Sequence, residues 1–292
     1  MTNRAAAVAA MRGLALGDAF GESWLLQPAA EPGAERRLAD GPWPWTDDTA
    51  MALSVLRILD RHGHVEQDAL ALAFAEAYAA DPYRSYGGSM HEVLRAIGQG
   101  EPWSVVTRRK FGGMGSWGNG AAMRVAPLGA WFADDLSVAA AEAARSAEVT
   151  HGHPEAVAGA VAVAVAAALS VTGVAGGELI GTVTARTPDS EVASRLRRVA
   201  RVALTAEPSH VAGMVGCGEQ ISAVDTVPYA IWSAAAHLDD LPGALWATAI
   251  PGGDSDTTCA IVGGIVGGRT GLDGVPADWS SEPLPAWVAE VG

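Results

Sequence analysis

The sequence has little basic charge, and this scarcity makes one large class of partner less favoured. Lys and Arg total 19 residues and Asp and Glu total 33, which gives a formal net charge of −14. A protein that binds nucleic acid through its phosphates normally presents a basic face. The densest basic group, within residues 195–201, is typical of the solvated side of a helix. The charge therefore argues against nucleic acid as a partner.

Cysteine is also scarce, and so are Leu, Ile and Phe in the one uncharged segment that is long enough to span a bilayer. The two cysteines, Cys217 and Cys259, form no CxxC pair, so neither a disulfide framework nor a zinc site is expected. Residues 1–11 lack the apolar core of a signal peptide. Residues 156–177 are uncharged, but their Ala and Gly content favours a buried helix over a membrane span. We expect a monomer in the reducing cytoplasm, with no membrane partner.

What the sequence does contain is enough apolar material for one globular domain over residues 1–292. Apolar residues make up 49% of the chain and charged residues 18%. Apolar residues recur at helical spacing, and alternating Val, Ile and Thr are scarce, so we predict an all-α fold: one compact helical domain. The predicted helices cover residues 50–61, 68–79, 89–98, 137–147, 155–171, 190–204, 226–238, 241–250 and 259–266.

Two short acidic clusters precede apolar helices near opposite ends of the chain. Residues 45–49 read Trp-Thr-Asp-Asp-Thr, and residues 251–258 read Pro-Gly-Gly-Asp-Ser-Asp-Thr-Thr. One polar residue suffices to cap a helix, so caps plus surface acids remain an alternative interpretation. Two acids and a hydroxyl exceed that need, and they are the oxygen ligands that Mg²⁺ prefers. If the clusters converge, they can hold two ions about 3.5–4 Å apart, which can polarise a substrate oxygen and position a water.

A glycine-rich loop that begins at Phe111 is the second candidate site. Its backbone N–H groups can hold a pyrophosphate without help from Lys or Arg, and Phe111 or Trp117 can stack on a flat ring. The alternative is a surface turn packed by Trp117. Asn119 is the candidate hydrogen-bond partner of a sugar hydroxyl. Of His151 and His153, either can be a helix cap or a core residue.

Arg124 lies in an apolar stretch, residues 121–128, that predicts the beginning of a helix. A buried arginine needs a carboxylate partner. We expect Asp18 or Glu22 to supply it, which would give Arg124 a structural role.

Five segments of the chain, taken together and in order, resemble the motifs of the ADP-ribosylglycohydrolases, the family of the dinitrogenase reductase-activating glycohydrolase. Each is weak alone, but their order covers nearly the whole chain. They read Gly17-Asp-Ala-Phe-Gly21, Trp45-Thr-Asp-Asp-Thr49, Gly118-Asn-Gly-Ala-Ala-Met-Arg-Val-Ala-Pro-Leu-Gly129, Thr150-His-Gly-His-Pro154 and Gly252-Gly-Asp-Ser-Asp-Thr-Thr258.

The resemblance implies an all-α fold with a loop-lined cleft that holds two Mg²⁺ or Mn²⁺ ions. It implies hydrolysis of a bond at C1″ of the distal ribose of an ADP-ribosyl group. By position, the metal ligands would be Thr46, Asp47, Asp48, Asp254, Asp256 and Thr257. Together with the loop reasoning, the substrate contacts would be Phe111, Gly115, Ser116, Trp117, Gly118, Asn119 and His151.

One position departs from the family pattern. Members usually carry a Glu seven residues after the Asp of the first motif, and this chain has Leu25 there. Glu22 is the nearby acid, so the expected catalytic carboxylates are Asp47, Asp48 and Glu22.

The partner implied is the ADP-ribose moiety of a modified protein or small molecule. We favour an arginine-type N-glycosidic bond. The alternatives are O-linked ADP-ribose (on serine or as O-acetyl-ADP-ribose), a catalytically impaired ADP-ribose-binding protein, and a different metal-dependent phosphohydrolase that releases AMP or phosphate.

Overall fold

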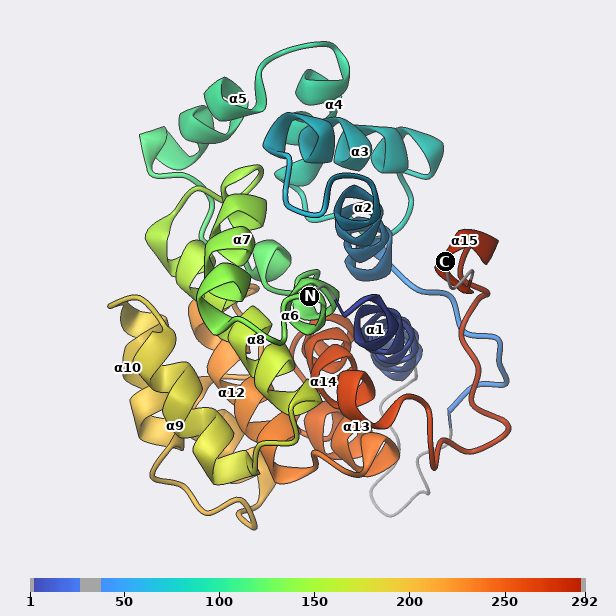
Figure 1. Ribbon diagram of the computed structural model, residues 1–292, viewed down its shortest axis with the longest axis vertical. Helices are drawn as coiled ribbons and strands as arrows, with labels where there is room; N and C mark the ends of the chain where they lie inside the picture. Colours follow the sequence, from blue (N-terminus) through green and yellow to red (C-terminus); the bar gives the residue numbers. More distant parts are fainter. Residues whose placement is uncertain (1–2, 27–37, 290–292) are drawn as a thin grey trace.

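The computed structural model describes residues 3–26 and 38–289, and over these ranges it is helical, with two isolated β-bridges and no strand (Figure 1). This confirms the all-α prediction. The helices are α1 (Arg4–Leu25), α2 (Asp47–His62), α3 (Gln67–Ala80), α4 (Met90–Gly98), α5 (Trp103–Arg109), α6 (Ala126–Trp131), α7 (Leu136–Glu148), α8 (Pro154–Val171), α9 (Gly176–Arg186), α10 (Glu191–Val199), α11 (Pro208–Val215), α12 (Ala223–Ala236), α13 (Leu241–Ala249), α14 (Ser255–Thr270) and α15 (Ala286–Ala289). Short 3₁₀ turns are η1 (Lys110–Gly113) and η2 (Asn119–Ala121).

Helix α14 is central, and its closest neighbour is α1, from the other end of the chain (Figure 1). Gly13, Gly17 and Gly21 recur every four residues and so share one face of α1. A Cβ added to Gly17 would lie 2.1 Å from the carbonyl oxygen of Cys259, and one on Gly21 would lie 2.2 Å from that of Ser255. The two backbones are therefore in direct contact. This glycine seam places the C-terminal half of α1 beside the first turn of α14.

Helix α8 is the uncharged segment that the composition assigned to the core. It is long and apolar enough to cross a membrane, but 78% of its apolar window is buried inside the structure. It packs against α6, α7, α9, α12 and α14. Its burial agrees with the prediction of a core helix.

The predicted helix boundaries differ from the structure in several places, including the starts of α2 and α14, which begin earlier, at Asp47 and Ser255. The helix predicted over residues 190–204 ends at Val199 and is followed by turns. The helix predicted near residues 121–128 begins only at Ala126, so Arg124 lies in the turn before it. Helices α1, α5, α9, α11 and α15 were not predicted.

Candidate active site

The start of α2 is held in place by a buried carboxylate from α1. Asp18 accepts hydrogen bonds from the backbone N–H of Thr46 at 2.9 Å and of Thr49 at 3.0 Å. It also accepts one from the Thr49 hydroxyl at 2.6 Å. Asp18 thus satisfies N–H groups that a helix start leaves unpaired, and it ties α2 to α1.

The first acidic cluster follows at once. Thr46 is the N-cap of α2: its Oγ1 accepts from the Asp48 N–H at 3.3 Å and donates to Asp48 Oδ2 at 3.2 Å. The other oxygen, Asp48 Oδ1, is buried and has no hydrogen-bond partner in the described part of the chain. The Asp47 N–H donates to the carbonyl of Arg84 at 2.7 Å. The cluster therefore presents buried carboxylate oxygens that its own helix does not use.

The second cluster lies at the start of α14. Asp254 is the N-cap residue, and its Oδ2 accepts a hydrogen bond from Asn119 Nδ2 at 2.6 Å. The same amide nitrogen donates to Thr226 Oγ1 at 3.0 Å. Asn119 therefore orients the Asp254 carboxylate, a role that the sequence did not predict. The side-chain carbonyl oxygen of Asn119 is the atom that remains for a ligand. Asp256 Oδ1 is buried with no partner among the described residues.

A single cavity of about 350 Å³ brings the two clusters together with the glycine-rich loop. The predicted site residues in its wall are Asp47, Asp48, Phe111, Ser116, Trp117, Gly118, Asn119, His151, Asp254, Asp256 and Thr257. Three predicted residues are not in the wall. Thr46 is buried as the N-cap of α2, and Gly115 packs against the backbone of the residues that follow His151. Glu22 accepts a hydrogen bond from the hydroxyl of Ser85.

The carboxylates in this cavity are buried from solvent and lie close enough to repel one another. Burial, and then the neighbouring carboxylates, raise the pKa of Asp47 and Asp48 well above the usual value. Burial also raises the pKa of Asp18 and of Asp254 to about 7, with Asp256 adding to both shifts. A bound cation would relieve this repulsion, so the donor set fits a divalent metal.

The geometry alone does not establish a metal centre. Across residues 3–26 and 38–289, no three His, Cys, Asp or Glu side chains lie close enough together to hold an ion. The binuclear site therefore stays a prediction.

His151 faces the glycine-rich loop as a neutral ring. It is buried, and its Nδ1 is 2.7 Å from the Thr150 hydroxyl. Burial, followed by the charge of Arg124, lowers the pKa of His151 to about 3. A Cβ on Gly120 would lie 2.8 Å from the ring, so this glycine admits the imidazole. The other histidine, His153, caps the start of α8.

Apolar side chains form one edge of the cavity. The rings of Phe111 and Trp117 lie 4.8 Å apart, and the two residues remain 44% and 38% exposed. Ile221, which is 61% exposed, joins them through a β-bridge between Gly118 and Ser222. Phe111 and Ile221 both have positive φ, at 51° and 50°, which is rare for such side chains. The backbone is strained at both residues, as is common at binding sites.

The prediction that Asp18 or Glu22 pairs with Arg124 is wrong. Arg124 is fully buried, but its Nη2 donates to the carbonyl of Ser146 at 2.7 Å and its Cζ lies 4.3 Å from the centre of the Phe74 ring. Among the described residues, no carboxylate forms an ion pair with it; Asp18 binds the start of α2 and Glu22 accepts from Ser85.

Glu22 and Leu25 lie on different parts of the last turns of α1. Burial, and then the charge of Asp256, raise the pKa of Glu22, so this acid is close to the second cluster. Leu25 ends the helix, is 45% exposed and is not in the cavity wall.

Several wall residues were not predicted: Gly120 and Met123 lie inside the motif that begins at Gly118 but were given no role, and no motif marks the others. The full set is Met51, Ser85, Gly87, Gly88, Ser89, Met90, Gly120, Met123, Gln220 and Ile221. The Ser-Tyr-Gly-Gly-Ser run at residues 85–89 was the available signal, since such loops allow ligands to approach the backbone.

Comparison with known proteins decides the family. The family model described as ADP-ribosylglycohydrolase matches residues 1–290. The chain belongs to the ADP-ribosylglycohydrolase family. It is 29% identical over 279 residues to ADP-ribosylhydrolase ARH3 of Homo sapiens, covering 85% of this chain and 76% of that protein. It is 30% identical over 273 residues to ARH3 of Danio rerio, covering 82% and 73%.

Two further matches lie outside the ARH3 group. The uncharacterized protein YegU of Escherichia coli is 28% identical over 301 residues, which covers 91% of this chain and 88% of YegU. A solved structure titled "ADP-ribosylglycohydrolase-related protein complex" aligns with a TM-score of 0.69 at 24% identity, covering 95% of this chain and 92% of that one. The structural match shows the shared fold.

Family membership confirms the resemblance and supports a hydrolase that acts on ADP-ribosyl groups. The names of the relatives specify no linkage. The preference for an arginine-type bond therefore has no support among them.

Proposed function

We propose that this chain removes ADP-ribose from a modified acceptor by hydrolysing the bond at C1″ of the distal ribose. The observation that carries the proposal is the single cavity, whose wall combines acidic clusters from both ends of the chain with the glycine-rich loop. We further propose that the protein acts as a cytoplasmic monomer that depends on two Mg²⁺ or Mn²⁺ ions.

The donor set supports the metal part of the proposal. Asp48 Oδ1 and Asp256 Oδ1 are buried oxygens without partners in the described residues, and the surrounding carboxylates repel one another. The residues that would hold the ions are Thr46, Asp47, Asp48, Asp254, Asp256 and Thr257. Bound divalent ions would supply Lewis-acid polarisation of a ribose or water oxygen.

The loop side of the cavity suits the ADP part of the substrate. Backbone N–H groups of residues 115–119 would bind the diphosphate, which explains how a chain without a basic patch can hold one. Phe111 and Trp117 would stack on the adenine or cover the ribose. His151 would exchange a hydrogen bond with a ribose hydroxyl. Because burial keeps its ring neutral at neutral pH, it would not act as a general acid.

Carboxylates would carry the chemical step. Glycosidic bonds break through an oxocarbenium-like state, which nearby negative charge stabilises. Asp47, Asp48 or Glu22 would orient and deprotonate the attacking water. Asn119 would keep Asp254 in one orientation through the 2.6 Å hydrogen bond, so that the second cluster faces the same point as the first.

The acceptor is tested with a panel of linkages: ADP-ribosyl-arginine, ADP-ribosyl-serine peptide and O-acetyl-ADP-ribose, each with Mg²⁺, with Mn²⁺ and with a chelator. We expect release of intact ADP-ribose from at least one substrate, and its loss on chelation. Asp47→Ala should abolish turnover, while Asp60→Ala, the same change at the exposed end of α2, should leave it intact.

Each rival function predicts a different result. Full activity in the chelator would disprove the metal-dependent mechanism. Release of AMP or phosphate would indicate a phosphohydrolase. Calorimetric binding of ADP-ribose without turnover of any substrate would indicate an impaired binding protein.

A further inference from the structure

A second cavity, of about 500 Å³, is lined by residues of α2 and α3 and by Pro285 and Trp287 near the end of the chain, and it shares no wall residue with the catalytic cavity. Leu53, Ile58 and Leu72 form aliphatic parts of its wall, and Trp45 and Trp287 supply two flat rings. Small-molecule sites typically have this size and this mainly apolar lining. The proposed function leaves the cavity unused.

Two arginines that form no ion pair among the described residues line this cavity. Arg57 and Arg61 lie one turn apart on α2, so their side chains share one face. Within the described residues, neither guanidinium has a hydrogen bond or an ion pair, and the Arg57 Cζ lies 5.9 Å from the centre of the Trp287 ring. A third arginine in the wall, Arg84, is already paired with Asp81 at 2.9 Å and also with Glu282.

The unpaired charge in the wall is positive. The wall contains two acids, Asp81, which is paired with Arg84, and Glu76. Among the described residues, Glu76 is therefore the one unpaired carboxylate opposite the two unpaired guanidiniums of Arg57 and Arg61. In a chain with a formal net charge of −14, such a surplus is a local exception. Paired guanidiniums bind phosphate and carboxylate groups with geometric fit, and they also stack on flat rings.

The backbone of Trp287 and the ring of Trp45 are held in place before any ligand arrives. The backbone carbonyl of Trp287 accepts a hydrogen bond from Arg4 at 3.2 Å, and Arg4 also binds Asp60 on α2 at 2.8 Å. The Arg84 Cζ lies 3.8 Å from the centre of the Trp45 ring. A preformed pocket avoids much of the ordering cost of binding.

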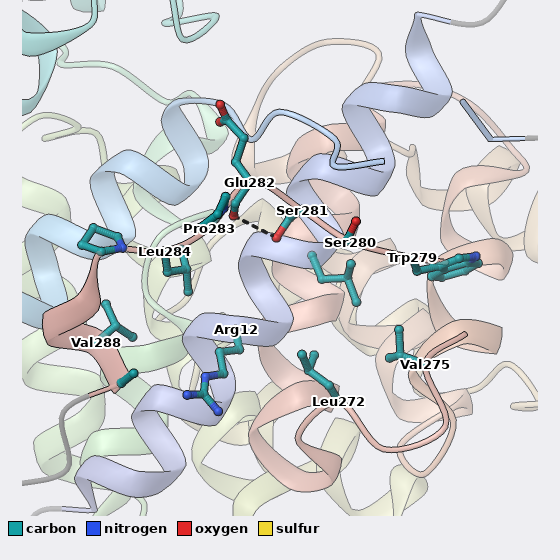
Figure 2. Close-up of a pocket in the computed structure, with 13 residues that line it drawn as sticks. Arg12, Leu272, Val275, Trp279, Ser280, Ser281, Glu282, Pro283, Leu284 and Val288 are labelled. Atoms are coloured by element: carbon teal, nitrogen blue, oxygen red, sulfur yellow. Dashed lines mark hydrogen bonds between the residues drawn. The ribbon is translucent and has the colours of Figure 1, made fainter. Parts of the chain in front are cut away.

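Another apolar cavity of the protein offers a contrast. It is about 370 Å³ in volume and lies between α1 and the chain that follows α14. Figure 2 shows its single arginine, Arg12, together with Leu272, Val275 and Trp279. It lacks a second guanidinium to complete an anion site, so it serves as a control.

We propose that the cavity between α2 and α3 binds a small aromatic anion. Arg57 and Arg61 hold the phosphate, sulfonate or carboxylate group, and the ring lies against Trp287 and the aliphatic wall. Because Trp45 and Arg84 belong to this wall, a bound ligand also contacts the residues beside the first acidic cluster.

The test is a fluorescence titration of the full chain with anilinonaphthalene sulfonate, an aromatic sulfonate whose emission rises in apolar sites. We expect saturable binding at one site. Arg57→Ala/Arg61→Ala should weaken it about tenfold or more, because both charge-assisted contacts are lost. Glu76→Gln should tighten binding, because it removes the opposing charge. Arg12→Ala should leave binding unchanged.

A competition arm identifies the natural ligand class. Displacement of the dye by AMP but not by phenyl phosphate would assign the site to nucleotides, and displacement by both would assign it to aromatic phosphates in general. The proposal is overturned if the double variant binds the dye as the wild type does, if Glu76→Gln weakens binding, or if Arg12→Ala weakens it equally. Unchanged thermal unfolding of each variant, measured alongside, excludes dye binding to unfolded chain.

Discussion

Replacing Gly17 by alanine should open the contact between α1 and α14 and disturb both acidic clusters. The new Cβ would lie 2.1 Å from the carbonyl oxygen of Cys259, against 3.4 Å or more for an ordinary contact. The atom it meets belongs to a helix backbone, which cannot rotate away. The helices must therefore separate by about an ångström, on the scale of strain that overpacked cores show.

The size of the effect follows from two opposing terms. Overpacking typically costs about 1–3 kcal/mol, and a rigid backbone neighbour places this case at the upper end. Alanine in a helix regains roughly 0.5–1 kcal/mol over glycine. The net loss is about 2 kcal/mol, which corresponds to a fall in Tm of roughly 3 °C for a chain of 292 residues.

The assay compares two glycine replacements by urea and thermal unfolding. Gly181 in α9 is the matched control, because nothing lies within 4 Å of the position of its missing Cβ. Gly181→Ala should be neutral or slightly stabilising. Equal unfolding midpoints for the two variants would refute the glycine seam as a close backbone contact. Hydrolysis should fall in Gly17→Ala alone, since Asp18 moves with α1.

Three further outcomes follow from buried groups. The pKa of His151 is lowered from 6.5 to about 3 in the folded state. Between these two values the unfolded chain binds a proton at His151 and the folded chain does not, so the free energy of unfolding falls as the pH drops from 6.5 to about 3. His151→Gln should remove that slope, about 1.4 kcal/mol per pH unit, from urea unfolding curves; parallel curves would contradict it. Asn119→Leu should lower the free energy of unfolding by about 1–3 kcal/mol, because the Asp254 carboxylate loses its donor; an unchanged urea midpoint would contradict it. The Cys259 thiol, fully buried and with its pKa raised by that burial, should react with a thiol reagent only after unfolding; rapid labelling of the native protein would place it elsewhere.

The sequence predicted strongly amphipathic helices such as α4 and α10, and it also predicted nearly uniformly apolar helices such as α8 and α13. Helix α1 is rich in Ala and Gly, and glycine is usually a sign of a break. Here Gly13, Gly17 and Gly21 are the contact surface itself, which only the position of α14 reveals.

The acidic motifs of the candidate site could be found from residue types, but their surroundings could not. The chemistry of Asp47, Asp48, Asp254 and Asp256 is visible in the sequence. The role of Asp18 gives no such signal, because its partners, two backbone N–H groups and the Thr49 hydroxyl, lie at the start of a different helix. Segment 85–90 likewise enters the wall through tertiary packing.

The glycine seam also sets when the site can form. It joins the first helix to one that is synthesised near the end of the chain, with most of the sequence between them. Closing so long a loop is a late and slow event in folding. A nascent chain that still lacks α14 contains the first acidic cluster but not the second, so the arrangement of the site has not yet formed. Uptake of the proposed cations, followed in time during refolding, would therefore report the last docking step and not the appearance of helices.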